Sequence, residues 1–315
     1  MTGSLTIRLA TRGSPLALWQ ARRVAFLMEA HDVATELVVV ETYGDRRTDV
    51  PLSRIGGQGV FVTEVQAAVS RGDADVAVHS AKDLPASPGI GESGLILACL
   101  PERADPRDVL VGATLATLPT GATVATGSAR RRVQLADLRH DLTFADLRGN
   151  MATRLARVGS GGATAVVVAR AALDRLEWEA PDGMPMETLS PSAMVPQVAQ
   201  GALALECRHE DHEVLSILEL LDDAGVRAQV EAERAFLAEL GGGCTLPVGA
   251  HAVFADSESD DRPHLRLTGI MGCADGRVVL RHTDQGADGP ALGRRVARYL
   301  LDDAGGAELG PWSPG

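Results

Sequence analysis

The chain is organised around the segment Ala77-Val78-His79-Ser80-Ala81-Lys82-Asp83-Leu84-Pro85. The apolar alternation that leads into His79 predicts a short buried strand, and the proline stops the structure that follows it. Lys82 is the only lysine among 30 basic residues, the rest being arginine. A compact ammonium beside a carboxylate at the end of a strand indicates a site. The alternative is a single surface lysine without a role.

The composition is that of a globular protein with more than one domain. A length of 315 residues is large for one hydrophobic core. The low aromatic content of 3% and the net charge of -12 argue against a nucleic-acid partner or an anionic membrane. The net charge does not exclude a local basic cleft that binds a small anion. The apolar runs are too short to cross a bilayer, and residues 1–14 lack a signal core. We therefore expect a cytoplasmic protein.

The four cysteines lie far apart and form neither a disulfide framework nor a zinc pattern. Cys99 and Cys207 fall in apolar strands and are expected in the core. Cys244 follows Gly241-Gly242-Gly243, a run without side chains that could cover the sulfur. Covalent attachment or nucleophilic catalysis at this thiol is the hypothesis that follows, and a loop cysteine without a role is the alternative.

The alternation of strands and helices predicts an α/β fold with mostly parallel sheets. In the first run we expect strands at 5–10, 37–42, 76–79 and 95–100 and helices at 16–30 and 60–71, with Ser14 as N-cap and Pro15 at the first helical position. Residues 43–59 are predicted to form a long loop, a candidate lid.

A second run follows, with strands at 109–111, 123–126, 142–144 and 165–168 and helices at 128–138, 150–158 and 169–176. Residues 181–196 look irregular, and 200–206 is predicted as a strand that rejoins the first sheet. The helices 211–222 and 226–240 lead to a small α+β unit, with strands at 246–254, 265–271 and 278–281 and a helix at 291–301.

Three predicted junctions between a strand and a helix carry arginine, namely Arg12, the run Arg130-Arg131-Arg132, and Arg148 with Arg154. A helix N-terminus is unfavourable for a cation and favourable for an anion. In open α/β sheets such ends face one crevice. We therefore expect a site that binds several carboxylates or phosphates through arginine, and solvated arginines are the alternative. Asp83, at the same kind of strand end, could hold a cationic atom or transfer a proton.

Several separate blocks make the chain similar to the porphobilinogen deaminase (hydroxymethylbilane synthase) family. They are Ala10-Thr11-Arg12-Gly13-Ser14-Pro15-Leu16-Ala17-Leu18-Trp19-Gln20, Val78-His79-Ser80-Ala81-Lys82-Asp83-Leu84-Pro85, Glu102-Arg103-Ala104-Asp105-Pro106-Arg107-Asp108, Leu147-Arg148-Gly149-Asn150, Thr153-Arg154-Leu155, Glu206-Cys207-Arg208, Ala232-Glu233-Arg234-Ala235-Phe236, Gly242-Gly243-Cys244 and Pro247-Val248-Gly249. The resemblance runs from about residue 5 to residue 254.

The resemblance implies two doubly wound α/β domains like type II periplasmic binding proteins and a small α+β C-terminal domain. The expected domains are 1–100 with 198–221, then 101–197, then 222–315. It also implies a monomeric cytoplasmic transferase of tetrapyrrole (haem) biosynthesis, which joins four porphobilinogen molecules head to tail into linear hydroxymethylbilane and releases ammonia. The primer would be a dipyrromethane cofactor held by a thioether to Cys244.

The resemblance also implies roles for single residues. Asp83 would be the catalytic acid and base, which helps ammonia leave and stabilises the azafulvene cation. The acetate and propionate groups of cofactor and substrate would be held by the arginines Arg12, Arg130, Arg131, Arg148, Arg154 and Arg175, together with Ser14, Lys82, Thr126, Ser128, Gly149 and Asn150. No metal is expected.

Three departures from the family pattern are visible. Arg54 and Gln58 stand in the lid-like loop where lysines are frequent, Gly127 replaces a hydroxyl residue, and Ala199 replaces a glycine. Two other function classes stay open from the residues alone. A two-lobed anion receptor without chemistry would not need the Cys244 arm, and a cysteine-dependent acyltransferase would need a histidine and an acid beside the thiol.

Overall fold

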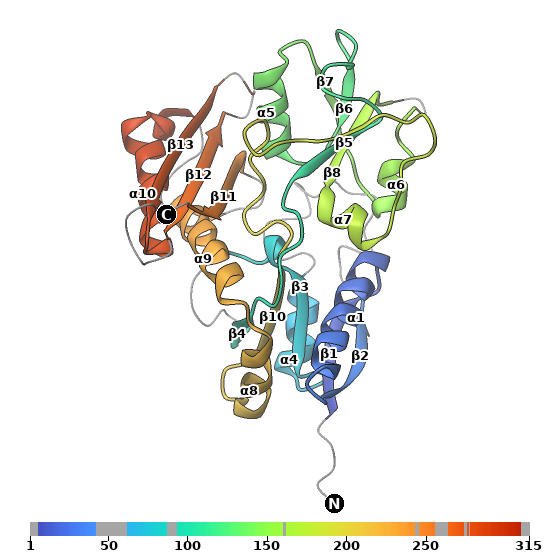
Figure 1. Cartoon of the computed structure of the whole chain (residues 1–315), viewed down its shortest axis with the longest axis vertical. Coiled ribbons are helices and arrows are strands. Elements are labelled where there is room, and N and C mark those ends of the chain that lie inside the picture. Colours follow the sequence, from blue (N-terminus) through green and yellow to red (C-terminus); the bar gives the residue numbers. More distant parts are fainter. Residues whose placement is uncertain are drawn as a thin grey trace, which may run out of the picture. The chain divides into compact units, whose positions relative to one another are not determined.

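The computed structural model describes residues 6–41, 62–86, 93–159, 162–242, 246–255, 264–273, 276 and 278–309. The chain divides into two compact units (Figure 1). Unit 1 contains Met1–Ala104 and Ala202–Arg227, and unit 2 contains Asp105–Gly201 and Ala228–Gly315. The division into three domains stays a prediction, and the predicted lid at 43–59 lies outside the described residues.

Unit 1 is built on a five-stranded sheet. Its strands are β1 (Thr6–Arg12), β2 (Ala34–Val40), β3 (Val76–Ser80), β4 (Leu95–Cys99) and β10 (Leu203–Arg208), in the order β2-β1-β3-β10-β4. Strand β1 pairs in parallel with β2 and β3, whereas β10 is antiparallel to β3 and β4. The predicted return of the chain to the first sheet is confirmed.

Helices cover both faces of this sheet because its strands are apolar on both sides. On one face, Leu9 packs in a cluster with residues of α1 (Pro15–Glu29) and α8 (His212–Leu221). On the other face, Ala10 packs in a cluster with residues of α4 (Thr63–Ser70). Neighbouring residues of β1 thus serve opposite faces, and the unit is doubly wound.

The start of α1 follows the predicted capping chemistry. Ser14 is the N-cap, and its side chain accepts a hydrogen bond from Ala17 N at 3.3 Å, with proline in the first turn. Strand β3 runs into one 3-10 turn, η1 (Ala81–Asp83). Because β1 and β3 are parallel neighbours, their carboxyl ends meet at one edge of the sheet. That edge therefore carries Arg12, Ser14 and Asp83.

Unit 2 contains a second five-stranded sheet. Its strands are β5 (Asp108–Val111), β6 (Thr123–Ala125), β7 (Thr143–Ala145), β8 (Ala165–Ala169) and β9 (Met186–Thr188), in the order β7-β6-β8-β5-β9. Strand β6 is parallel to β7 and β8, and β5 is antiparallel to β8 and β9. Strand β5 therefore has the same place in this sheet as the antiparallel strand β10 has in the sheet of unit 1. The prediction of two doubly wound α/β sheets is confirmed.

Two local predictions in unit 2 were wrong. The helix expected at 150–158 is only α6 (Met151–Leu155), because Val158 forms a bridge to Ala163 instead of continuing the helix. The segment 181–196, expected to be irregular, contains β9, whose three residues are too few to produce a periodic signal. The predicted helices α5 (Ala129–Leu138) and α7 (Arg170–Arg175) are present.

The rest of unit 2 is the predicted small α+β part. It has an antiparallel sheet of β11 (Val248–Phe254), β12 (Leu265–Gly272) and β13 (Val279–Gly286), with α9 (Ala224–Glu239) and α10 (Gly289–Arg298), followed by the single turns η2 (Tyr299–Asp303) and η3 (Gly306–Leu309). A Cβ on Gly269 would lie 2.5 Å from the ring of Phe236, so glycine is what lets α9 approach the sheet.

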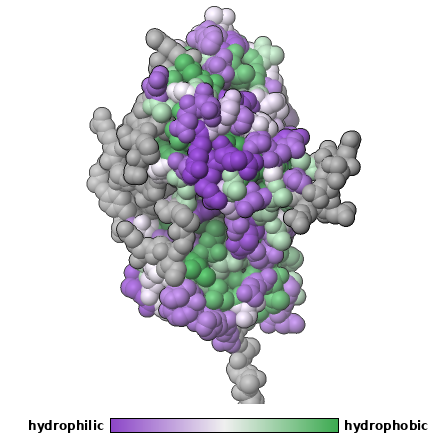
Figure 2. Space-filling model, turned by 90° about the vertical axis from the view of Figure 1, so that its left-hand side faces the viewer, coloured by the Kyte–Doolittle hydropathy of each residue, from purple (hydrophilic) through white to green (hydrophobic). Residues whose placement is uncertain are grey.

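Hydrophilic residues cover much of the described surface on the face drawn in Figure 2, and apolar residues gather in smaller areas. Within the described ranges, no helix combines the length and the apolar character that crossing a membrane requires.

Candidate active site

A pocket in unit 1 lies at the carboxyl ends of β1 and β3. Its polar lining consists of Arg12, Ser14, Gln20, His79, Ser80 and Asp83, and the rest of its lining is apolar. The volume of about 70 Å³ exceeds that of one ordered water several times. The structure thus brings three predicted site residues, Arg12, Ser14 and Asp83, into one pocket with cationic and anionic groups.

Sequence reasoning missed part of the pocket wall. Gln20 Nε2 donates a hydrogen bond to Ser80 Oγ at 2.7 Å and so connects α1 to β3. His79 is buried, and its Nε2 lies 3.0 Å from Oε2 of Glu206 in β10.

Lys82, predicted as a ligand for carboxylates, lies in η1 directly before Asp83 and is partly exposed.

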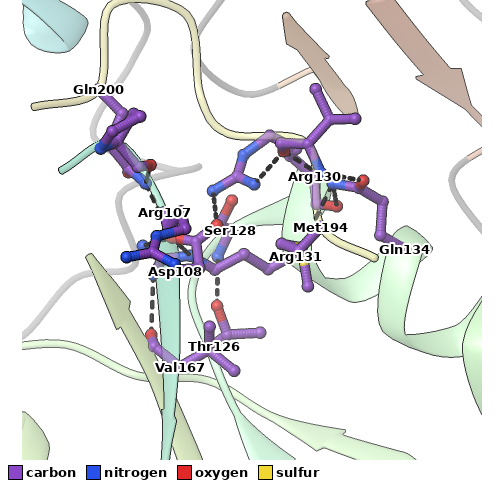
Figure 3. A network of polar contacts seen from close by, with 12 residues as sticks. Arg107, Asp108, Thr126, Ser128, Arg130, Arg131, Gln134, Val167, Met194 and Gln200 are labelled. Atoms are coloured by element: carbon purple, nitrogen blue, oxygen red, sulfur yellow. Dashed lines mark hydrogen bonds and ion pairs between the residues drawn. The ribbon is translucent and has the colours of Figure 1, made fainter. Parts of the chain in front are cut away.

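The arginines at the start of α5 surround a buried carboxylate (Figure 3). Asp108 is fully buried, and its Oδ2 lies 2.8 Å from Arg130 Nη2. Its Oδ1 lies 2.8 Å from Arg131 Nη2 and accepts a further hydrogen bond from Gln200 Nε2 at 2.9 Å. Arg130 also donates to Val195 O at 2.6 Å, and Arg131 donates to Val167 O at 2.8 Å.

This arrangement corrects one inference from the sequence. The arginines at this helix N-terminus were expected to be explained by an external anion or to be solvated. Arg130 is 1% exposed and Arg131 8% exposed, and the anion that both contact is Asp108. A role of these two arginines in carboxylate binding stays a prediction. The two arginines and the one aspartate together still carry a net positive charge.

The electrostatics of Asp108 follow from this cluster. Burial alone would raise its pKa, but the charges of Arg130 and Arg131 and the hydrogen bond from Gln200 outweigh burial, and the pKa falls from 3.8 to about 2. Asp108 is therefore ionised at neutral pH. The sequence contained a signal for this cluster. Asp108 opens a strand of otherwise apolar residues, and an aspartate that is buried there needs a cationic or hydrogen-bonding partner.

The other predicted carboxylate ligands of unit 2 lie on loops and helix ends around this sheet. Arg148 follows β7, and its buried Nη1 has no hydrogen-bond partner among the described residues. Asn150 caps α6 by accepting from Thr153 N at 3.0 Å, and Gly149 O accepts from Arg154 Nε at 2.9 Å. Arg175 is 6% exposed and donates to Gly201 O at 2.7 Å.

Thr126 and Ser128 flank Gly127, one of the departures from the family pattern. The buried Thr126 accepts a hydrogen bond on Oγ1 from Ser128 N at 3.2 Å, and Ser128 is the N-cap residue of α5. A Cβ on Gly127 would lie 2.9 Å from Leu147 O. Glycine at this position therefore fits the close approach of the loop after β7.

Another departure, Ala199, has a left-handed backbone with φ of 58°. Glycine adopts this conformation without the steric cost that a Cβ brings. The N–H of Ala199 donates to the buried Glu233 Oε2 at 2.7 Å, which helps to hold the strained turn next to Gln200. The departures at 54 and 58 lie outside the described residues.

Cys244, the predicted attachment residue, also lies outside the described residues. The buried thiols behave as expected for core residues. Burial raises the pKa of Cys207 to about 11 and that of Cys99 further, so neither is a reactive thiolate at neutral pH. No cluster of candidate metal ligands occurs in the part of the chain that the structure describes.

Comparison with known proteins extends the resemblance to nearly the whole chain. Residues 7–216 match the family description "Porphobilinogen deaminase, dipyromethane cofactor binding domain", and residues 228–302 match "Porphobilinogen deaminase, C-terminal domain". Among solved structures, the methionine-binding protein MetQ aligns with 70% of this chain and 92% of its own at 12% identity, with a TM-score of 0.41.

Curated relatives named porphobilinogen deaminase align over nearly their full length. The protein from Brevibacillus brevis is 40% identical over 307 residues, which is 96% of each chain. The protein from Nocardia farcinica is 46% identical over 304 residues, 94% of this chain and 86% of the relative. The protein from Roseiflexus castenholzii is 45% identical over 315 residues, 98% of this chain and 99% of the relative. The chain belongs to the porphobilinogen deaminase family.

Proposed function

We propose that this protein joins four porphobilinogen molecules head to tail into linear hydroxymethylbilane and releases one ammonia for each molecule added. The observation that carries the proposal is the pocket in which Asp83 lies with Arg12 and Ser14. Porphobilinogen has an amine that must leave and two carboxylates that must be held. A site with one carboxylate among cationic and hydroxyl groups suits that substrate.

In this proposal Asp83 is the acid and base of the reaction. A carboxylate can stabilise the cation that forms when the amine leaves, and it can accept the proton released from the pyrrole carbon after coupling. Arg12, Ser14 and Lys82 bind substrate carboxylates beside it. Guanidinium groups suit this task because they bind carboxylates through two parallel hydrogen bonds.

The residues of unit 2 fit a cofactor that carries several carboxylates. Arg148 Nη1 is a buried donor with no acceptor among the described residues, and leaving such a donor unpaired costs about 1–3 kcal/mol. We propose that Arg148, Arg154 and Arg175, with Arg131, Thr126 and Ser128, hold the acetate and propionate groups of a dipyrromethane. When bound through Cys244, that group supplies the primer to which units are added.

The turnover assay separates this proposal from an anion receptor. The purified protein incubated with porphobilinogen should release ammonia and hydroxymethylbilane at a molar ratio of four to one. Binding of porphobilinogen without release of ammonia would favour the receptor.

Replacing Arg148 with alanine should stall elongation. The variant loses a donor aimed at ligand carboxylates, and a hydrogen bond to a charged group contributes about 1.5–3 kcal/mol. We expect enzyme–intermediate complexes that carry too few added units, measured by the mass of the intact protein after addition of porphobilinogen. Arg157→Ala on the same segment is the control. Wild-type product formation by the Arg148 variant would contradict its role.

We also propose that the enzyme acts as a monomer in the cytoplasm, in three domains bounded at about residues 100, 198 and 222. The support is the resemblance to the family together with the two kinds of sheet in unit 2. Sedimentation of the purified protein measures the oligomeric state.

A further inference from the structure

His79 is a buried titratable group to which the roles above give no task. It is the last residue but one of β3, lies four residues before Asp83 and lines the same pocket. Its side chain is 3% exposed, and its Nε2 lies 3.0 Å from Glu206 Oε2. The contact has the distance of an ion pair without the alignment of a strong hydrogen bond. Such a contact gains Coulomb attraction when the imidazole carries a second proton.

Glu206 is placed to be the counter-ion of that imidazole. Its side chain is 10% exposed, and a buried carboxylate requires donors or a cation around it. Gln66 of α4 donates a hydrogen bond from Nε2 to Glu206 Oε2 at 2.8 Å. The glutamate therefore contacts residues of α4 and β3 at once, and its carboxyl group lies on the side of Nε2 of the imidazole. Nδ1 is the other ring nitrogen that can exchange a proton.

The proposed reaction needs a place to hold a proton. Adding one unit breaks the C–N bond of the aminomethyl group and forms a C–C bond to a pyrrole carbon. The amine enters as ammonium and leaves as ammonia with the electron pair of the C–N bond. The pyrrole carbon loses one proton, and ammonia takes up one proton to become ammonium. Nothing is oxidised or reduced. The C–N bond breaks before the C–C bond forms, so the ammonia has left when the pyrrole carbon gives up its proton, and a group in the pocket must take that proton from Asp83 before the next unit arrives.

We propose that His79 stores this proton, with Glu206 as counter-ion, and that Glu206 is the positioning residue of the imidazole. The inference rests on the proposed function. The proton passes from the pyrrole carbon to Asp83, then to the imidazole of His79, and from the imidazolium to water, where it balances the proton that the released ammonia takes up. Among the described residues, Glu206 of β10 contacts His79, and the charged residues Asp83 and Arg12 line the same pocket, while Gln66 of α4, which donates to Glu206, is neutral. Histidine suits the task because one ring nitrogen can take up and give up a proton while the other stays next to the carboxyl group.

The test compares His79→Gln with wild type in the cofactor-loaded enzyme. Glutamine keeps a donor for Glu206 but cannot take up a proton. We expect kcat to fall about 10²-fold, the lower end of what a general acid or base contributes. KM for porphobilinogen and the intact mass of the loaded protein should stay unchanged. The pH profile of kcat should lose the limb that follows the imidazole, which a merely structural role would not remove.

The control is His209→Gln, which removes a histidine paired with Glu210 at 2.8 Å in an exposed setting and should leave kcat and its pH profile unchanged. A kcat within twofold of wild type with an unchanged pH profile in His79→Gln would overturn the inference. Should that variant not fold, Glu206→Gln is expected to shift the same pH limb, and an unshifted limb counts against the pair.

Imidazole 15N resonances of the wild-type holoenzyme give a measurement independent of any variant. We expect the ring of His79 to change its protonation over the pH range of activity, and a ring that never does would overturn the inference.

The Asp83→Asn variant separates a failure of this inference from a failure of the proposed function. If wild type releases no ammonia from porphobilinogen, the proposed function itself fails. If wild type is active, Asp83→Asn is inactive and His79→Gln is fully active, only the inference about His79 fails.

Discussion

Replacing Asp83 with asparagine should leave the fold intact and remove nearly all turnover. Asparagine has almost the shape of aspartate, and Asp83 ends a short turn on the pocket wall whose backbone bond runs from Leu84 N to Ala81 O. The amide can neither neutralise a cation nor accept a proton. Loss of a positioned acid or base typically lowers kcat about 10²–10⁴-fold.

The measurement is kcat for release of ammonia, with thermal unfolding of the same preparation to verify the fold. Asp73→Asn is a matched control in unit 1, since Asp73 pairs with Arg71 at the surface and is 55% exposed. Its activity should equal that of wild type. An Asp83→Asn enzyme that turns over like wild type would remove Asp83 from the mechanism.

Replacing Asp108 with asparagine should destabilise the protein severely. Two guanidinium groups that are almost fully buried would lose their common anion. Breaking a buried ion pair by removing one partner costs about 3–5 kcal/mol, a large fraction of the stability of an ordinary domain. Chemical denaturation followed by circular dichroism measures this loss. A change below about 1 kcal/mol would show that Asp108 does not hold the cluster.

Asp105→Asn is the control. Asp105 lies three residues before Asp108 and pairs with Arg107 in a more exposed setting. The surface pair should contribute about 0–1 kcal/mol. The pH dependence follows from the pKa of Asp108, which is lowered from 3.8 to about 2 in the folded protein. Its stabilising contribution is complete above about pH 4 and is lost as the pH falls through 2. Asp108→Asn should lack this part of the acid transition.

Local patterns in the sequence predicted the parts of the fold that depend on neighbouring residues. Ser14 and Pro15 fixed the start of α1 through capping and backbone geometry, and the apolar run ending at His79 fixed β3. Since parallel strands align their carboxyl ends, the pocket with Arg12 and Asp83 followed from these elements. The polar contacts of Arg12 and Asp83 with a ligand stay predictions.

Contacts between residues distant in the chain could not be predicted. Asp108 meets Arg130 and Arg131 only because β5 enters its sheet antiparallel to β8, and no local signal encodes that pairing. The same holds for His79 and Glu206, which come from neighbouring strands with the first segment of unit 2, Asp105–Gly201, between them in sequence. The sequence pattern placed arginine at helix starts correctly but did not identify the anion beside it.

The central claim is that a primer built from two pyrrole units is attached to Cys244. The intact mass of the purified protein tests it most directly. We predict a mass above that calculated from the sequence by one dipyrromethane, and the calculated mass without adduct in the Cys244→Ser variant. An active wild-type protein whose mass equals that of the bare sequence would contradict the account.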